Sequence, residues 1–131
     1  MHNPLTARRV VAVVPDLFFA TRISATAAQV GVRLDLPPSG AALEAALEAI
    51  RAAAPALVIL DLHAPGDPLA LARALRADPA TRTLRVIGFY SHVDRALRAA
   101  ALEAGLDEVL PRSAFTARLP ALLRGDGDTP G

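Results

Sequence analysis

The segment ALVILDLHAPGD, residues 56–67, decides the fold of this chain more than any other stretch. Its apolar run has the length of one strand and ends on a single carboxylate, Asp61, before a loop that contains Pro65 and Gly66. A continuous apolar run is typical of a parallel strand that helices cover on both faces. Open α/β sheets bind their ligands at the carboxyl ends of such strands. The segment therefore predicts a buried parallel strand whose end, at Asp61, belongs to a binding site.

The composition is that of one globular domain. The chain has 131 residues, 53% of them hydrophobic and 21% charged, with a formal net charge of +1, which fits one core and no nucleic-acid partner. Cysteine is absent, so disulfides, catalytic thiols and thiolate zinc sites are excluded. No apolar run reaches the roughly 18 residues of a membrane span, and the start MHNPLTARR is unlike a signal sequence. We therefore expect a cytoplasmic protein without a membrane partner.

Five strand-like runs alternate with five helix-like runs. The predicted strands are residues 9–14, 32–36, 56–61, 84–89 and 108–110, and the predicted helices are residues 16–30, 41–54, 67–77, 91–104 and 113–122. This alternation predicts an α/β fold with right-handed crossovers and a parallel sheet. Five strands favour the flavodoxin-like (βα)5 doubly wound sheet of order 2-1-3-4-5, with helices on both faces. Residues 1–124 then form the domain, and residues 125–131 a disordered tail.

Local signals place the ends and faces of the helices. Ser91, with Asp94 three residues later, resembles a capping box for the fourth helix, and Ser113 is expected to cap the fifth. The second helix is expected to turn Leu43 inward, together with Leu47 and Ile50. Pro120 should kink or shorten the last helix because proline has no N–H to donate.

Polar residues gather where four of the strands end. They are Asp16, Asp61 with His63, Tyr90 with Ser91 and His92, and Arg112. Each also has a purely structural explanation: Asp16 as a helix N-cap, Tyr90 as a strand-end aromatic with its hydroxyl in water, and the histidines as polar loop residues. A carboxylate that ends a buried strand is costly unless it is paired, so we expect Asp61 to belong to a site.

Three motifs resemble, in order and spacing, the receiver domain of response regulators (CheY-like domains). They are LVILDLHAPG at 57–66, LRADPATRTLRVIGF at 75–89 and AGLDEVLPRS at 104–113. The resemblance extends more weakly from Val10 to Leu123. It implies the fold given above and a role in two-component or phosphorelay signal transduction.

The resemblance assigns roles to the site residues. Asp61 corresponds to the aspartate that receivers phosphorylate, and His63 to the residue whose backbone carbonyl helps to bind Mg²⁺. Asp16 corresponds to one of the two acids that end the first strand of receivers, and Pro15 stands in place of the other. With one acid missing, the predicted Mg²⁺ site of Asp16, Asp61 and the His63 carbonyl is weak or absent, because Mg²⁺ prefers several oxygen ligands.

Other positions depart from the receiver pattern. Tyr90 stands where receivers have threonine or serine, and Ser91 stands where they have a small residue. Arg112 replaces their lysine, Ser113 replaces the cis proline after it, and all 14 basic residues of the chain are arginine. Arginine favours bidentate pairing with a carboxylate. We therefore predict that Arg112 pairs with the buried Asp61.

These features indicate a receiver-like module with a degenerate phosphorylation site that acts by protein–protein interaction, and not an enzyme. One alternative is a working receiver that a histidine kinase phosphorylates on Asp61, with Arg112 in the role of the lysine. Another is a small α/β enzyme that uses Asp61 with His63 or His92 as acid and base, although no nucleophile motif is present. Nucleotide binding is not predicted, because no glycine-rich loop follows the first strand.

The expected partner is a protein, either a sensor kinase or a downstream signalling protein. Receivers commonly associate through the fourth helix, fifth strand and fifth helix. Here that face mixes basic and acidic residues: Arg95, Arg98 and Arg118 with Glu103, Asp107 and Glu108. Alternating charges allow a two-fold contact, so the sequence predicts either a weak, salt-sensitive homodimer or a solvated surface.

Overall fold

The computed structural model describes residues 8–37, 42–91 and 94–126, in which strands and helices alternate along the chain. The elements are β1 (Arg9–Val13), α1 (Leu17–Val30), β2 (Arg33–Asp35), α2 (Leu43–Ala53), β3 (Leu57–Asp61), α3 (Pro68–Ala77), β4 (Arg85–Tyr90), α4 (Arg95–Glu103), β5 (Glu108–Pro111) and α5 (Arg112–Arg124). The strands form one parallel sheet in the order β2-β1-β3-β4-β5. The predicted flavodoxin-like fold is confirmed.

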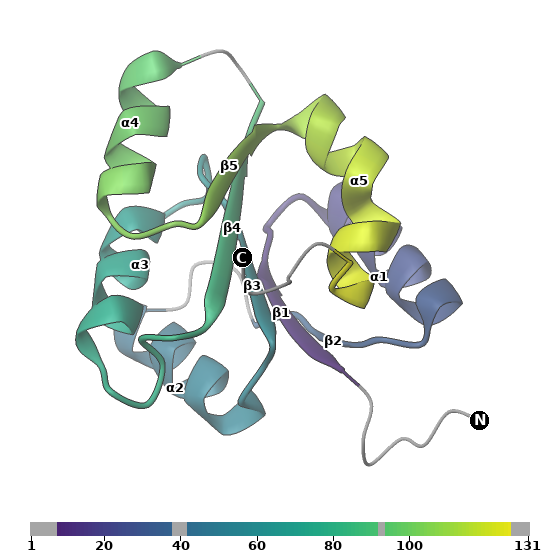
Figure 1. Ribbon diagram of the computed structural model, residues 1–131, viewed down its shortest axis with the longest axis horizontal. Coiled ribbons are helices and arrows are strands. Elements are labelled where there is room, and N and C mark those ends of the chain that lie inside the picture. The colour runs from purple at the N-terminus through teal and green to yellow at the C-terminus, as the bar shows by residue number, and fades with distance from the viewer. Residues whose placement is uncertain (1–7, 38–41, 92–93, 127–131) are drawn as a thin grey trace.

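Helices cover both faces of this sheet (Figure 1). α1 and α5 pack on one face, where the core contains Phe19, Phe89 and Phe115. α2, α3 and α4 pack on the other face, against a core that includes Leu60 and Tyr90. All five residues of β3 are buried, which is the reason its sequence is apolar on every side chain except the last.

The register of the strands brings their carboxyl ends to one edge of the sheet. In β3, Leu60 lies opposite Val13 of β1, and Asp61 lies opposite Phe89 of β4. In β4, Tyr90 lies opposite Pro111 of β5. The loops that leave these strands therefore start side by side, and this edge holds the predicted site residues.

Three predictions about helix starts and faces are wrong. The N-cap of α4 is Asp94, whose Oδ1 accepts the Leu97 N–H at 2.9 Å, and not Ser91. A carboxylate directly before the first turn is a better placed acceptor than a hydroxyl three residues earlier. Ser113 lies inside the first turn of α5, whose N-cap is Pro111. Leu43 is 42% exposed and lines an open cavity of about 300 Å³ between α2 and the loop after β3.

The last helix runs through Pro120 and ends at Arg124, so proline does not shorten it. Its buried side chains hold it on the sheet: Phe115, Leu119, Leu122 and Leu123. Burial of one such side chain contributes roughly 1.5–3 kcal/mol, which outweighs the loss of one helical hydrogen bond. Of the predicted tail, Gly125 and Asp126 close α5 with N–H bonds to Leu122 and Ala121, and residues 127–131 lie outside the described residues.

No helix within the described ranges is long and apolar enough to cross a membrane.

Candidate functional site

Asp61 is the buried acid at the centre of the carboxyl edge. Its side chain is 7% exposed, and its Oδ1 accepts the backbone N–H of His63 at 2.9 Å. The backbone N–H of Ala64 donates to the Asp61 carbonyl at 3.0 Å, which closes a tight turn after β3. Within the described residues Asp61 forms no ion pair. The strand end and the turn hold the carboxylate at a fixed place on this edge.

Asp16 lies in the loop after β1 and makes two side-chain contacts. Its Oδ1 accepts the Phe19 N–H at 3.1 Å, so it is the N-cap of α1. Its Oδ2 accepts a hydrogen bond from Nη2 of Arg112 at 3.1 Å. The Phe19 N–H first, and the Arg112 guanidinium second, hold the pKa of Asp16 below its usual range. The capping interpretation of Asp16 is confirmed.

Arg112 therefore pairs with Asp16, and the prediction that it pairs with Asp61 is wrong. The reason is an aromatic support that spacing along the sequence does not reveal. The Arg112 guanidinium carbon lies 4.1 Å from the centre of the Phe19 ring, a distance at which a cation is attracted to the ring face. Phe19 follows the N-cap Asp16 by three residues, so one helix start supplies both the carboxylate and the ring that orient Arg112.

The Phe19 ring is itself packed in an aromatic cluster. Its centre lies 5.0 Å from that of Phe89 and 5.9 Å from that of Phe115, and those two rings stack at 4.7 Å. These separations lie in the favourable range for ring pairs. Phe89 belongs to β4 and Phe115 to α5, so the support beneath Arg112 is part of the core and holds the guanidinium in place.

The other predicted residues take varied positions. Tyr90 is 8% exposed and packs in the core on the face of the sheet that α2, α3 and α4 cover. Ser91 and the His63 side chain are exposed at the same edge. His92 lies outside the described residues.

These residues do not fit the magnesium site that the resemblance implied. Pro15 supplies no carboxylate, Asp16 is bound by Arg112 and Phe19, and Oδ1 of Asp61 is bound by His63. In the part of the chain that the structure describes, no three His, Cys, Asp or Glu side chains gather as a metal site. Asp16 already accepts a hydrogen bond from the positively charged guanidinium of Arg112, and a second cation beside that group would be repelled.

An open cavity of about 320 Å³ lies beside the Asp16–Arg112 pair. Its lining residues come from the start of α1 and the start of α5: Asp16, Phe18, Phe19, Arg22, Arg112 and Thr116. Phe18 is 91% exposed at its rim, which makes it a large apolar side chain in water beside two arginines.

Solved structures resemble this fold over nearly its whole length. The N-terminal receiver domain of RstA from Klebsiella pneumoniae, in its BeF3-activated form, is 25% identical, with a TM-score of 0.72 over 89% of this chain and 99% of that one. A CheY-like response regulator receiver domain protein from Methanospirillum hungatei is 14% identical, with a TM-score of 0.78 over 94% of this chain and 95% of that one. This chain has the receiver-domain fold.

A further receiver-fold neighbour is the receiver domain of a sensor histidine kinase from Pseudomonas aeruginosa, solved with a magnesium ion in its active-site cleft. It is 20% identical, with a TM-score of 0.77 over 91% of this chain and 96% of that one. No family model and no curated protein matches the chain. The assignment of the receiver fold therefore rests on structural similarity, because the sequence identity to these neighbours is only 14–25%.

Sequence reasoning missed Phe19 as a member of the site. Phe19 lies on the buried face of α1, with the Arg112 guanidinium over its ring. The only available signal was the spacing of three residues from an N-cap acid. That spacing predicts the Phe19 N–H bond to Asp16 and says nothing of the cation that rests on the ring.

Proposed function

We propose that this chain is a receiver-like signalling module of a two-component system, in the cytoplasm, with a degenerate phosphorylation site. It acts by protein–protein interaction and not as an enzyme. The receiver fold and the position of Asp61 at the end of β3 support a signalling function of the receiver type. The contact between Arg112 and Asp16 supports the degenerate site.

The Arg112–Asp16 contact carries the proposal because it affects two requirements of phosphoryl transfer. Transfer to a carboxylate needs a hard cation that neutralises phosphate charge and is held by oxygen ligands. Here the remaining acid of the first loop is bound to a permanently charged side chain. Arg112, in turn, lies over the Phe19 ring and pairs with Asp16, and it forms no ion pair with Asp61. The resting protein is thus expected to accept phosphate poorly.

Incubation with a small-molecule phosphodonor and Mg²⁺, followed by intact-mass measurement, tests this proposal. We expect the parent chain to show no stable phosphoryl adduct. A double variant, Pro15→Asp with Arg112→Lys, supplies the missing acid and exchanges the guanidinium for an ammonium. It should gain an adduct under the same conditions.

The control for this experiment is Asp61→Asn in both backgrounds. An adduct on the double variant must disappear when Asp61 is replaced, because the amide cannot be phosphorylated. A stable adduct on the parent chain that is lost in Asp61→Asn would overturn the proposal and favour a working receiver.

The working receiver remains the second candidate because one observation favours it. Asp61 keeps a buried position at the strand end and forms no ion pair with another described residue. Its second carboxylate oxygen, Oδ2, accepts no hydrogen bond among the described residues. In this candidate a histidine kinase would phosphorylate Asp61, and Arg112 would have to leave Asp16 to reach the phosphoryl group.

The predicted partner face has fewer available acids than its sequence suggests. Glu108 accepts hydrogen bonds from Arg118 at 2.6 Å and Arg85 at 2.8 Å. These bonds, that of Arg118 first, hold the pKa of Glu108 below its usual range. Asp107 is paired with Arg76 at 2.9 Å. A homodimer through this face stays a prediction, and it would have to form around acids that already have partners inside the chain.

A further inference from the structure

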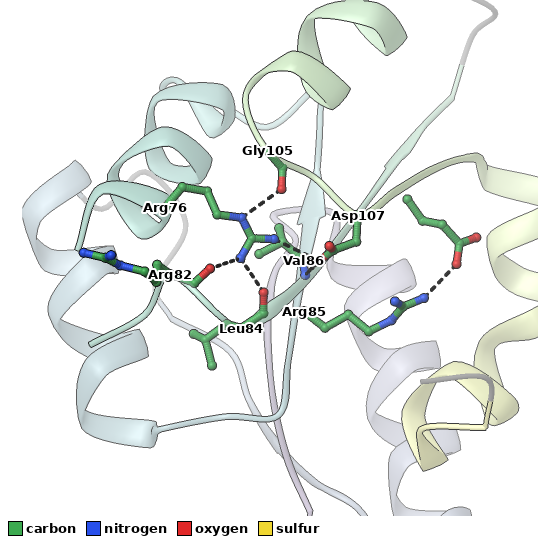
Figure 2. Close-up of polar contacts among 8 residues, drawn as sticks. Arg76, Arg82, Leu84, Arg85, Val86, Gly105 and Asp107 are labelled. Carbon is green, nitrogen blue, oxygen red and sulfur yellow. Dashed lines mark hydrogen bonds and ion pairs between the residues drawn. The ribbon is translucent and has the colours of Figure 1, made fainter. Parts of the chain in front are cut away.

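Arg76 donates hydrogen bonds to three backbone carbonyls near the starts of β4 and β5 (Figure 2). Arg76 is the penultimate residue of α3, and its Nε donates to the Gly105 carbonyl at 2.9 Å. Its Nη1 donates to the carbonyls of Arg82 at 2.8 Å and Leu84 at 2.5 Å. Its Nη2 forms an ion pair with Asp107 at 2.9 Å. We call Arg76 with these four acceptors the Arg76 clamp.

Asp107 extends the clamp into the sheet. The Oδ2 atom that accepts from Arg76 also accepts the backbone N–H of Val86 at 2.8 Å, as Figure 2 shows. The backbone N–H of Asp107 donates to the Val86 carbonyl at 2.8 Å. The first β4–β5 register pair, Ile87 with Glu108, follows directly. The clamp therefore ties the turn between α4 and β5 to the first residues of β4.

Gly105 is shaped to receive the arginine. Its φ is +110°, a conformation that favours glycine, and a Cβ at this position would lie 2.6 Å from Cγ of Arg76. The Arg76 side chain thus passes directly over Gly105, just beyond the last turn of α4. The carboxyl end of a helix carries partial negative charge and attracts a cation. The Arg76 side chain therefore fits the space above Gly105, and its positive charge complements the carboxyl end of α4.

α4 itself is packed weakly against the sheet. Ala101 is its only fully buried residue, and Leu97 is half-buried. By contrast α3 buries Leu71, Ala72 and Leu75, and α5 buries Phe115, Leu119, Leu122 and Leu123. Burial of a methyl group stabilises far less than burial of a leucine or phenylalanine. The position of α4 therefore depends on the contacts at its ends. At the carboxyl end these are the clamp and the buried side chains of Ala104 and Leu106.

We infer that the Arg76 clamp is a latch that holds α4 on the sheet, and that α4 is the helix this protein can release while the rest of the domain stays folded. Release would break the bonds from Arg76 to Gly105 and Asp107 and free the turn that follows α4. The core on the α1 and α5 face shares no residue with the clamp. That face stays intact when the latch opens.

Native-state hydrogen exchange of the full chain tests the latch. Arg76→Lys keeps the charge but loses the planar set of donors, so amides in residues 97–107 should exchange at least about ten-fold faster. Amides of β1, β3 and α1 should keep their parent rates. The faster exchange should be insensitive to low urea, because local opening exposes little surface. Arg73→Lys, an exposed position one turn earlier in α3, is the matched control and should change nothing.

A second variant covers the case in which Arg76→Lys fails to fold. Gly105→Ala keeps residue 76 as arginine but puts a methyl group 2.6 Å from its Cγ, which displaces the side chain, so it should produce the same local pattern in residues 97–107. Unchanged α4 exchange in a folded variant would overturn the inference. Equal acceleration in every strand and helix would also overturn it, since the clamp would then be part of the global stability and not a latch.

Discussion

Gly88→Ala is the substitution for which the structure gives the sharpest stability prediction. Gly88 lies in the middle of β4, where an added Cβ would be 2.4 Å from Cδ2 of Leu106 and 3.0 Å from Cδ2 of Leu62. Leu62 follows Asp61 directly, and Leu106 lies between two residues of the Arg76 clamp. The single methyl group would therefore press on both the candidate site and the latch.

The size of the effect follows from these distances. Carbon atoms in contact prefer separations of roughly 3.5–4.0 Å, so Leu106 must retreat by about 1 Å and Leu62 by about half that. Overpacking of this kind costs about 1–3 kcal/mol, while replacing a strand glycine by alanine gains only about 0.5–1 kcal/mol from chain entropy. The packing term is larger. We expect a net loss of about 1–2 kcal/mol, or a fall in Tm of about 4–8 °C for a domain of this size.

Urea unfolding followed by far-UV circular dichroism measures this loss, with an unchanged m value if the native state keeps its compactness. Leu106→Ala is the partner variant for a double-mutant cycle. It opens the space that the new methyl group needs, so the double variant should be less destabilised than the sum of the two single variants. Additive effects, or a Gly88→Ala chain as stable as the parent, would refute the packing argument.

Three further predictions concern Asp16, the aromatic cluster and self-association. Asp16→Asn keeps an acceptor for the N-cap but loses the charge that pairs with Arg112. The folded-state pKa of Asp16 lies below its usual value. The contribution of this charge to stability is therefore present at neutral pH and is lost as the pH falls through the folded-state pKa. Urea titrations should therefore separate Asp16→Asn from the parent at neutral pH and converge under acid conditions, and a constant gap would contradict this. Phe115→Leu should cost about 1–2 kcal/mol, since it removes a buried ring stacked at 4.7 Å; the exposed Phe18→Leu is the control, and equal losses would argue against the cluster. In sedimentation, any dimer should weaken with high salt and with Arg95→Glu, and a dimer that ignores both would have its interface elsewhere.

Local patterns in the sequence were sufficient for the architecture. The apolar run that ends at Asp61 became a strand with every residue buried, because only a strand between two helical layers can use apolar side chains on both faces. The helix predicted over residues 67–77 is α3, whose N-cap Asp67 accepts the Ala70 N–H at 3.0 Å and whose first residue is Pro68. Signals of this kind act over three or four residues, so they can be read without knowing the rest of the fold.

The partners of the charged side chains could be decided only by the tertiary structure. Asp16 and Arg112 are 96 residues apart in the sequence, and the motifs brought Arg112 to an edge where two carboxylates were within its expected reach. The Phe19 ring packs against Phe89 and Phe115, and it holds the Arg112 guanidinium beside Asp16. Arg76 and Asp107, 31 residues apart, likewise form a clamp that no local pattern marks. A long side chain can reach several partners, and the packed surface around it selects one of them.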